Sequence, residues 1–500
     1  MKKTCLLTIK GKCIIMNNIV FALTAGLSLI CIMAGCNKLS TNGLSETDPV
    51  VKKVIISIDK TISFQTIDGF GFFGAYDVWW GSNMWNSTWS EKVISDLGIT
   101  IWRNEWFPPS IPGATQDANW EKQKPVVVGL KAAADKYGVN LKNIVTIWSP
   151  PADLKWQCSF TWAGDVNATR NEGTVSTRNG GTLNPNKYSE YADWLKTCIK
   201  FYKDEGVNLY ALSLQNELMF RQTFNSCMYT TAWYCDLLNN VVPIIKASYP
   251  EVKIFGAENM MEMEGKDNNW PVFYHSAIKK DALATSNIDI LAVHGYTDGV
   301  APSTGSELAK MWTNHLEQFS KPMNKPVWMT ETSGYSDSWE KSGSTPGALN
   351  LAMDICSGLI YGNISAWVWW QGSQSGSIGE FNLMNGTTSG KKYFVSKHYY
   401  RYIRPGAVRI KAISDDNEVY ISAFENILKG TSTLVIINGG RADKTIALDG
   451  IDLPAEYSIY LTTSGDENCK LNGVVRSGKS NSFILPAKSV VTLQAGGDPL

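Results

Sequence analysis

Eight short runs of apolar, β-branched and aromatic residues recur along the middle of the chain, separated by longer segments with a different spacing. Short apolar runs bounded by polar turns predict strands that are buried on both faces. The predicted strands are residues 69–74, 99–103, 144–148, 210–214, 252–256, 288–293, 326–329 and 364–369.

The segments between these runs carry apolar residues at the three- and four-residue spacing of amphipathic helices. The clearest predicted helices are residues 90–97, 126–137, 188–204, 232–248 and 348–359. Strands alternating with helices indicate a parallel sheet, and eight repeats indicate an α/β fold closed into a (β/α)₈ TIM barrel. An open doubly wound sheet is the competing fold, but no GxGxxG or GKS/T phosphate loop follows any of these eight strands: the GxGxxG at residues 69–74 is the first strand itself, and the GKS at residues 478–480 lies far beyond the last strand.

The pattern changes near Gly406 to β-rich runs without helices. Turn-forming Gly, Asn and Asp separate these runs, which predicts a C-terminal β-sandwich over residues 404–500 after a catalytic barrel over residues 67–403. An apolar run within residues 51–66 predicts an N-terminal strand that joins the sandwich. Four runs of the sandwich are clear: residues 419–424, 433–437, 457–462 and 489–493.

The N-terminus has the pattern of an export signal, with four lysines before the apolar run 19–34. Met-Ala-Gly-Cys at residues 33–36 resembles a bacterial lipobox, which predicts a lipoprotein signal peptide over residues 1–36 and lipidation of Cys36. Residues 37–50 are then predicted to form a flexible tether. The prediction is an exported, membrane-anchored lipoprotein at the periplasmic side or the cell surface, with an uncleaved membrane anchor as the alternative.

The composition favours a neutral partner. Acidic and basic residues number 46 each and form no long run, which argues against nucleic acid and against an anionic membrane surface. Nineteen Trp and twenty Tyr suit sugars, which present apolar faces and hydroxylated rims, although a protein core also uses such residues. We expect a polysaccharide or oligosaccharide substrate, membrane contact only through the lipid, and a monomer.

Six cysteines follow Cys36 without a CxxC pair or any metal-like spacing. We therefore expect no metal and no cofactor. In an oxidising compartment the pair to test for a disulfide is Cys158 with Cys227, because both fall in loops at one end of the predicted barrel. Buried free thiols are an equal alternative.

Polar and aromatic side chains follow seven of the eight predicted barrel strands. Loops after the strands build the active face of such a barrel, so these side chains would surround one opening. Packing explains any one of them alone, but seven together favour a functional site. In chain order they are 103–105, 148–149, 215–217, 258–259, 294–296, 330–331 and 369–371.

Two carboxylates have the relation that glycosidic bond cleavage with retention requires. One carboxylic acid protonates the leaving oxygen and one carboxylate attacks the anomeric carbon, at a separation of roughly 5 Å. Glu217 follows strand four and Glu331 follows strand seven, so they face each other across the barrel mouth. We predict Glu217 as general acid/base, Glu331 as nucleophile, and Asn216 as a hydrogen-bond partner of the adjacent sugar hydroxyl.

Two other carboxyls compete for these roles. Glu105 also follows an Asn but lies after strand two, and Glu258 ends strand five, so neither has the required relation to strand seven. Arg103, two residues before Glu105, is instead predicted to keep the nucleophile charged.

The chain resembles glycoside hydrolase family 30, whose acid/base follows Asn on strand four and whose nucleophile ends strand seven. The resemblance implies that the sandwich packs against the barrel and takes an N-terminal strand. It also implies that Tyr296 orients Glu331 and that a set of side chains binds the sugar: Arg103, Trp148, Asn216, His294, Tyr296, Tyr335, Trp369 and Trp370. The segments that carry it are 65–71, 148–151, 212–217, 294–296, 328–331 and 396–409.

The same resemblance suggests several substrates. Family members attack xylan, β-1,6-linked glucans and galactans, or glucosylceramide, and segments 206–217 and 367–370 look most like the bacterial xylanase branch. Glucuronate-requiring members of that branch carry an Arg after strand eight, whereas residues 371–377 here include no basic residue. We therefore predict an endo-β-1,4-xylanase-like enzyme that does not need glucuronate.

Four alternatives to a xylanase can be compared with these residues. A β-1,6-glucanase or a glucosylceramidase-like hydrolase would use the same carboxylate pair. A non-catalytic surface glycan-binding lipoprotein would need no acid opposite a nucleophile. An aldolase-type barrel would need a strand-end Lys, and none of the eight strand ends has one.

Overall fold

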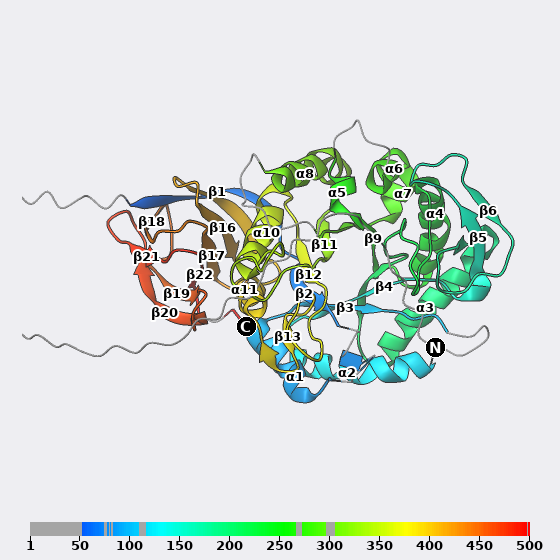
Figure 1. The fold of residues 1–500 in the computed structure, drawn as a ribbon, viewed down its shortest axis with the longest axis horizontal. Helices are drawn as coiled ribbons and strands as arrows, with labels where there is room; N and C mark the ends of the chain where they lie inside the picture. Colours follow the sequence, from blue (N-terminus) through cyan, green and yellow to red (C-terminus); the bar gives the residue numbers. More distant parts are fainter. Residues whose placement is uncertain are drawn as a thin grey trace, which may run out of the picture. The chain divides into compact units, whose positions relative to one another are not determined.

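Eight parallel strands close into a barrel in the computed structural model (Figure 1). The structure describes residues 53–74, 78–79, 81, 84–109, 117–266, 273–296, 306–497 and 499–500. Around the barrel the strands run in the order β10, β11, β12, β2, β3, β4, β8, β9. Their bounds are β2 Gly69–Phe73, β3 Ile101–Glu105, β4 Lys142–Thr146, β8 Leu209–Ser213, β9 Lys253–Met260, β10 Ile290–His294, β11 Val327–Glu331 and β12 Ala366–Trp369. The predicted fold class is confirmed.

The barrel interior changes from apolar to polar along the strands. Ile101, Ile144 and Ala292 belong to a small buried cluster to which seven of the barrel strands contribute. Since side chains alternate between the two faces of a strand, the next residues on the same face lie two positions further on. These are Arg103, Thr146 and His294, all fully buried. The alternation therefore places a polar layer above the apolar one, at the carboxyl ends of the strands where a barrel carries its site.

Helices cover the outside of the barrel, as Figure 1 shows. In α3 the buried residues Tyr191, Leu195, Cys198 and Tyr202 follow the three- and four-residue spacing, which explains why this segment was recognisable from sequence. The helical segments are α1 Ser87–Glu91, the π-helical turns Lys92–Leu97, α2 Asp117–Lys136, the 3₁₀ turns Ala152–Leu154 and Pro185–Lys187, α3 Tyr188–Asp204, α4 Thr231–Ser248, α5 Met261–Glu264, α6 Tyr274–Lys280, α7 Ala282–Asn287, α8 Glu307–His315, the π-helical turn Leu316–Ser320, α9 Lys321–Met323, α10 Ala348–Tyr361 and α11 Lys391–Tyr400.

One predicted helix is longer than expected. The sequence pattern placed its start at residue 126, directly after Pro125, but α2 begins at Asp117 and continues through that proline. Proline inside a helix removes one backbone hydrogen bond. Buried Trp120 and Val126 on either side of Pro125 pack into the barrel core, and this burial offsets the loss.

The C-terminal strands form a nine-stranded sheet system with its own core. Its order is β20, β19, β22, β17, β16, β15, β1, β18, β21. The N-terminal strand β1, Val54–Thr66, pairs antiparallel with β15 and parallel with β18. The other strands are β15 Val408–Ser414, β16 Val419–Asn426, β17 Thr431–Asn438, β18 Lys444–Gly450, β19 Glu456–Thr462, β20 Asn468–Arg476, β21 Phe483–Leu485 and β22 Ser489–Ala495.

Helix α11 joins the barrel to this sandwich. His398 on α11 is fully buried, with Nδ1 2.8 Å from Thr492 Oγ1 and Nε2 2.7 Å from Thr462 Oγ1. Burial, and then the charge of Lys397, lower the pKa of His398 to about 3, so the imidazole is neutral at physiological pH. A neutral imidazole can bond to hydroxyls on both sides without the cost of burying a charge.

Two further features bear on the site and on earlier predictions. A three-stranded sheet, β5 Lys155–Ser159, β6 Thr169–Asn171 and β7 Thr182–Leu183, is inserted between β4 and α3, and a hairpin, β13 Met384–Asn385 and β14 Thr388–Ser389, follows β12. Cys158 and Cys227, the pair named as the one to test for a disulfide, are both free thiols, as are the other four described cysteines, so the structure agrees with the alternative of free thiols. Burial and the neighbouring Cys227 raise the pKa of Cys158 to about 12, which disfavours the reactive thiolate.

The predicted signal peptide, the lipidated Cys36 and the tether over residues 37–50 lie outside the described residues. Within the described part of the chain, no helix has the length and apolar character needed to cross a bilayer.

Candidate active site

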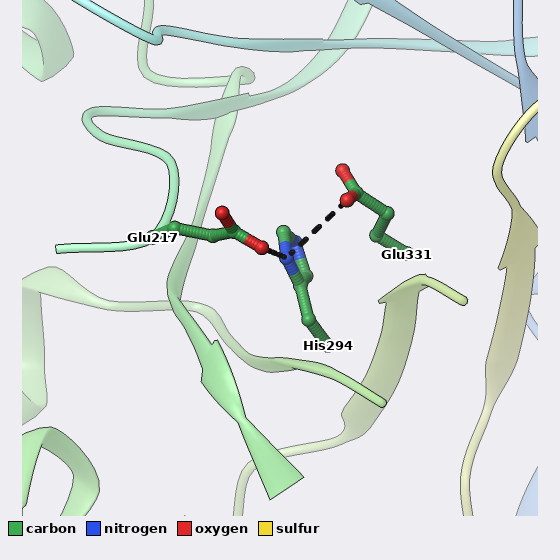
Figure 2. A group of neighbouring side chains, drawn as sticks. All are labelled: Glu217, His294 and Glu331. Atoms are coloured by element: carbon green, nitrogen blue, oxygen red, sulfur yellow. Dashed lines mark hydrogen bonds and ion pairs between the residues drawn. The ribbon is translucent and has the colours of Figure 1, made fainter. Parts of the chain in front are cut away.

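Glu217, His294 and Glu331 meet at the carboxyl ends of the barrel strands. Glu217 follows β8, His294 ends β10 and Glu331 ends β11. One side-chain nitrogen or oxygen from each lies within 4.8 Å of the others, and Figure 2 shows the imidazole between the two carboxyls. The sequence predicted Glu217 and Glu331 to face each other, and the structure brings them together. Carboxyl oxygens this close fit a retaining pair better than an inverting pair, whose carboxyls stand roughly 6.5–9.5 Å apart to leave room for a water.

Glu217 is held on a tight turn after its strand. Its φ is 42°, in the left-handed region that non-glycine residues seldom occupy. Hydrogen bonds brace the turn on both sides, from the Asn216 N–H to the Ile147 carbonyl at 2.7 Å and from the Phe220 N–H to the Glu217 carbonyl at 2.9 Å. Strained backbone of this kind persists where the surroundings over-determine it, often at functional sites.

The environment of Glu217 suits a proton donor. Burial raises the pKa of its carboxyl, and the charge of Glu331 raises it further, against the opposing hydrogen bond from His294. A raised pKa keeps a carboxyl protonated closer to neutral pH. Glu217 therefore has the character of the general acid in the pair.

Glu331 is buried and held by two donors. Arg103 Nη1 donates to Glu331 Oε2 at 2.6 Å, and the Tyr296 hydroxyl donates to Glu331 Oε1. Hydrogen bonds to both oxygens orient the Glu331 carboxylate. Arg103 and Tyr296 thus contact the predicted nucleophile, as the sequence and the resemblance suggested.

Arg103 also orients Asn216. The guanidinium is fully buried, and its Nη2 donates to Asn216 Oδ1 at 2.9 Å. Because Arg can only donate, the amide oxygen of Asn216 must face it. The NH₂ group of Asn216 has no partner among the described residues, so it is available to donate to a sugar hydroxyl.

His294 links the two sides of the site. Its Nδ1 lies 3.1 Å from Glu217 Oε1 and its Nε2 lies 3.4 Å from Glu258 Oε1. Burial alone would lower the pKa of His294, but the charge of Glu331 and the hydrogen bonds to Glu217 and Glu258 raise it to about 9. A protonated imidazole has no lone pair for a metal, and Arg103 already neutralises Glu331, so the three groups suit proton chemistry better than a cation.

Glu258 is the residue whose role the sequence did not reveal. It was considered only as an alternative acid, but it is fully buried and accepts hydrogen bonds from Arg103 at 3.0 Å and Thr146 at 3.2 Å. Burial raises its pKa, yet the charges of Arg103 and His294 outweigh burial and lower it. Glu258 is therefore a buried anion that positions both cations of the site. Its position at the end of a barrel strand was the sequence feature that could have indicated a role in the site.

Aromatic side chains form one wall of the cleft. The rings of Phe73 and Trp370 stack at 4.3 Å, and Trp148 lies 5.5 Å from Phe73 and 6.0 Å from Trp370. The guanidinium carbon of Arg103 lies 4.9 Å from the Trp148 ring, which connects this wall to the catalytic carboxylates. Trp148 and Trp370, both predicted to contact sugar, line a cavity of about 780 Å³. Tyr296 is 37% exposed beside Glu331.

The prediction for Tyr335 and Trp369 needs correction. Both were expected to line the cleft, but they are 1% and 0% exposed and pack on each other with ring centroids 6.0 Å apart. The Tyr335 hydroxyl donates to Asp354 Oδ2, and the Trp369 indole N–H donates to the Phe381 carbonyl. Neighbouring residues on a strand point to opposite faces, so Trp370 and Trp369 cannot both face the cleft.

Two parts of the chain match known glycosyl hydrolase domains. Residues 406–493 match a model described as the glycosyl hydrolase family 30 beta sandwich domain, and residues 230–389 match a glycosyl hydrolase catalytic core. Glucuronoxylanase XynC of Bacillus subtilis (strain 168) is 26% identical over 478 residues, covering 93% of this chain and 97% of that protein.

Solved structures show the same architecture. A family 30 endoxylanase from Clostridium papyrosolvens C71 superimposes with a TM-score of 0.69 at 23% identity, covering 88% of this chain and 100% of that chain. A solved endo-β1,6-glucanase superimposes with a TM-score of 0.65 at 20% identity, covering 89% of this chain and 95% of that chain.

Proposed function

Because this chain belongs to glycoside hydrolase family 30, we propose that it cleaves a β-linked polysaccharide by double displacement, with Glu217 as acid/base and Glu331 as nucleophile. The single observation that carries the proposal is the close approach of the two carboxyls, an oxygen of each lying within 4.8 Å of the other, with Arg103 and Tyr296 on Glu331 and His294 on Glu217. Retaining enzymes hold the two carboxyl groups roughly 5–5.5 Å apart, whereas inverting enzymes hold them roughly 6.5–9.5 Å apart.

The first step joins the sugar to the protein. Glu331 Oε attacks the anomeric carbon while Glu217 gives its proton to the leaving oxygen, so the glycosidic bond breaks as the ester forms. Asn216 donates to the hydroxyl beside the reacting carbon, an interaction that strengthens as positive charge develops on the sugar. In the second step Glu217, now ionised, takes a proton from water, which attacks the same carbon and releases Glu331.

Xylan without glucuronate is the substrate that we propose. The similarity to a glucuronoxylanase and to an endoxylanase supports xylan as the substrate. The absence of a basic residue from residues 371–377 supports independence from glucuronate. An Arg in this segment would pair with a uronic acid, and the polar residues present cannot. A β-1,6-glucanase is the second candidate, favoured by the structural likeness to an endo-β1,6-glucanase.

Product analysis tests the proposal. The protein truncated before Asp48 is incubated with undecorated xylan, glucuronoxylan, arabinoxylan, β-1,6-glucan and β-1,6-galactan, with Glu217→Gln as the blank. Xylo-oligosaccharides from undecorated xylan are the expected result. Release of products only from β-1,6-glucan would leave the proposed mechanism unchanged and identify β-1,6-glucan as the substrate. Binding to these polymers with no product from any would favour a non-catalytic glycan-binding protein.

We also propose that the chain is exported and anchored by a lipid on Cys36. The lipobox-like sequence at residues 33–36 supports this location, which also gives access to polymeric carbohydrate outside the cytoplasm. Cys36→Ala should move the full-length protein from the membrane fraction to the soluble fraction of a bacterial host. An unchanged membrane fraction would favour an uncleaved anchor instead.

A further inference from the structure

The cavity of about 780 Å³ is lined on one side by the aromatic wall of Phe73, Trp148 and Trp370. The rest of its lining includes parts of the chain that are distant in sequence: the end of β3, residues 174–178 of the inserted sheet region, and residues 224–225 after β8. A volume of this size suits a small ligand or a sugar unit. Neither Glu217 nor Glu331 lines it, so it is not the place where the bond is cleaved.

One carboxyl lines this cavity, whose lining combines aromatic rings with polar side chains. Glu105 ends β3 and is 7% exposed, and its Oε1 accepts a hydrogen bond from Asn225 Nδ2 at 3.4 Å, its only side-chain bond in the described part of the chain. A buried carboxyl normally satisfies both oxygens within the protein. Glu105 therefore retains hydrogen-bonding capacity at the cavity wall, and Phe107 and half-exposed Phe224 supply apolar faces.

We propose that this cavity is a subsite for one neutral sugar unit adjoining the unit held at the catalytic pair, and that Glu105 and Asn225 bind its hydroxyl groups. The proposal rests on the function proposed above and adds a specificity-determining residue to it. Aromatic rings contact the apolar face of a pyranose while a few polar groups at its rim fix its orientation, the combination found here.

The charge of the cavity favours a neutral sugar over a uronic acid. Burial raises the pKa of Glu105 to about 8, helped by the charge of Glu331 and opposed by the Asn225 hydrogen bond and Arg103. The carboxyl is therefore protonated at neutral pH, able both to donate to and to accept from a hydroxyl. Arg178, the cation that lines the cavity, is exposed, so solvent screens its attraction for a carboxylate.

Oligosaccharide binding to an inactive variant tests the subsite proposal directly. Undecorated β-1,4-xylo-oligosaccharides of increasing length, and β-1,6-gluco-oligosaccharides as a second series, are titrated calorimetrically into Glu331→Ala protein. In this background Glu105→Ala and Asn225→Ala should each weaken binding of the longer members by about 10-fold, the effect of losing one or two hydrogen bonds. Binding of the shortest members should not change. Glu105→Gln should keep most of the affinity, because an amide also donates and accepts.

Several outcomes would overturn the subsite. The subsite would be overturned if oligosaccharide binding weakened equally at every length. It would also be overturned if binding did not weaken in Glu105→Ala, Asn225→Ala and Phe224→Ala. Tighter binding of glucuronate-bearing oligosaccharides that Arg178→Ala abolishes would overturn the assignment to a neutral sugar. Glu172→Ala, an exposed carboxyl in the inserted region, is the matched control and should bind like the parent.

Hydrolysis assays of the wild-type protein distinguish a failure of the subsite proposal from a failure of the proposed function on which it rests. No hydrolysis of any substrate would count against the proposed function, even with length-dependent binding. If the wild type hydrolyses a substrate but the Glu105 and Asn225 variants weaken binding equally at every oligosaccharide length, the result would count against the subsite alone.

Discussion

Arg103 and Glu331 are joined by a hydrogen bond of 2.6 Å between residues 228 positions apart in the chain. Arg103 lies on β3 and Glu331 on β11, with β2 and β12 between them in the barrel. The same guanidinium also bonds to Asn216, Glu258 and Thr146. One buried cation thus sets the positions of the nucleophile, of an amide predicted to bind sugar, and of a buried anion.

Substituting Arg103 by Lys tests this arrangement. Lys keeps the charge but loses the planar fork that reaches several acceptors, so it cannot hold Glu331 and Asn216 together. We expect kcat to fall by about 100-fold or more. Thermal unfolding should show only a moderate loss of stability, since Glu258 keeps a nearby cation. A kcat close to that of the wild type would contradict the positioning role.

The two carboxyls should be distinguishable by azide rescue. Glu331→Ala should reduce turnover by about 10⁴-fold or more, since no covalent intermediate can form. Azide can then attack from the vacated side and give a glycosyl azide of inverted configuration. Glu217→Ala should instead give an azide product of retained configuration from a substrate with a good leaving group. NMR of the two products checks the assignment, and exchanged configurations would reverse the roles.

The pH dependence should report on His294. Its hydrogen bond lowers the pKa of Glu217, while burial and Glu331 raise it. Removing the imidazolium by His294→Gln therefore raises the pKa of Glu217. Because the first step needs Glu217 protonated, the basic limb of the kcat/KM profile should move to higher pH, with a lower maximum. A basic limb that stays in place or moves to lower pH would show that His294 does not act on Glu217.

The same imidazole links stability to pH. The folded-state pKa of His294 is about 9, above the ordinary 6.5. Its stabilising contribution is therefore complete below about pH 6.5 and is lost as the pH rises through about 9. Compared with His294→Gln, the wild type should lose more unfolding free energy between pH 6.5 and 9, by about 1 kcal/mol or more. Denaturant unfolding of both proteins at the two pH values checks this, and parallel curves would contradict it.

Two tyrosines offer a matched comparison of catalytic and structural roles. Tyr296 is partly exposed and donates to Glu331, whereas Tyr335 is buried and donates to Asp354. Tyr296→Phe should lower kcat by about 10-fold or more with little change in unfolding. Tyr335→Phe should cost about 1–3 kcal/mol of stability, because it leaves a buried carboxyl without this donor, and should affect kcat less. Steady-state kinetics and denaturant unfolding separate the two effects.

Much of the architecture could be predicted because it depends on local patterns. Helix α3, Tyr188–Asp204, agrees with its predicted bounds, since its buried side chains recur at helical spacing. The barrel strands were recognisable as apolar runs, and their observed ends differ from the predicted ends by only a few residues. The pair Glu217 and Glu331 followed from their positions after the fourth and seventh strands, because the topology of a barrel determines which strand ends face each other.

Contacts between distant residues could not be read in this way. No sequence pattern connects Glu258 with Arg103 and His294, or places Glu105 in the wall of the cavity that Trp148 and Trp370 line, because those relations depend on side-chain packing. It also could not tell that Trp370 lines the cleft while Trp369 and Tyr335 are buried. Periodicity shows that neighbours point to opposite faces, but only the tertiary structure decides which face is covered by protein and which is open to substrate.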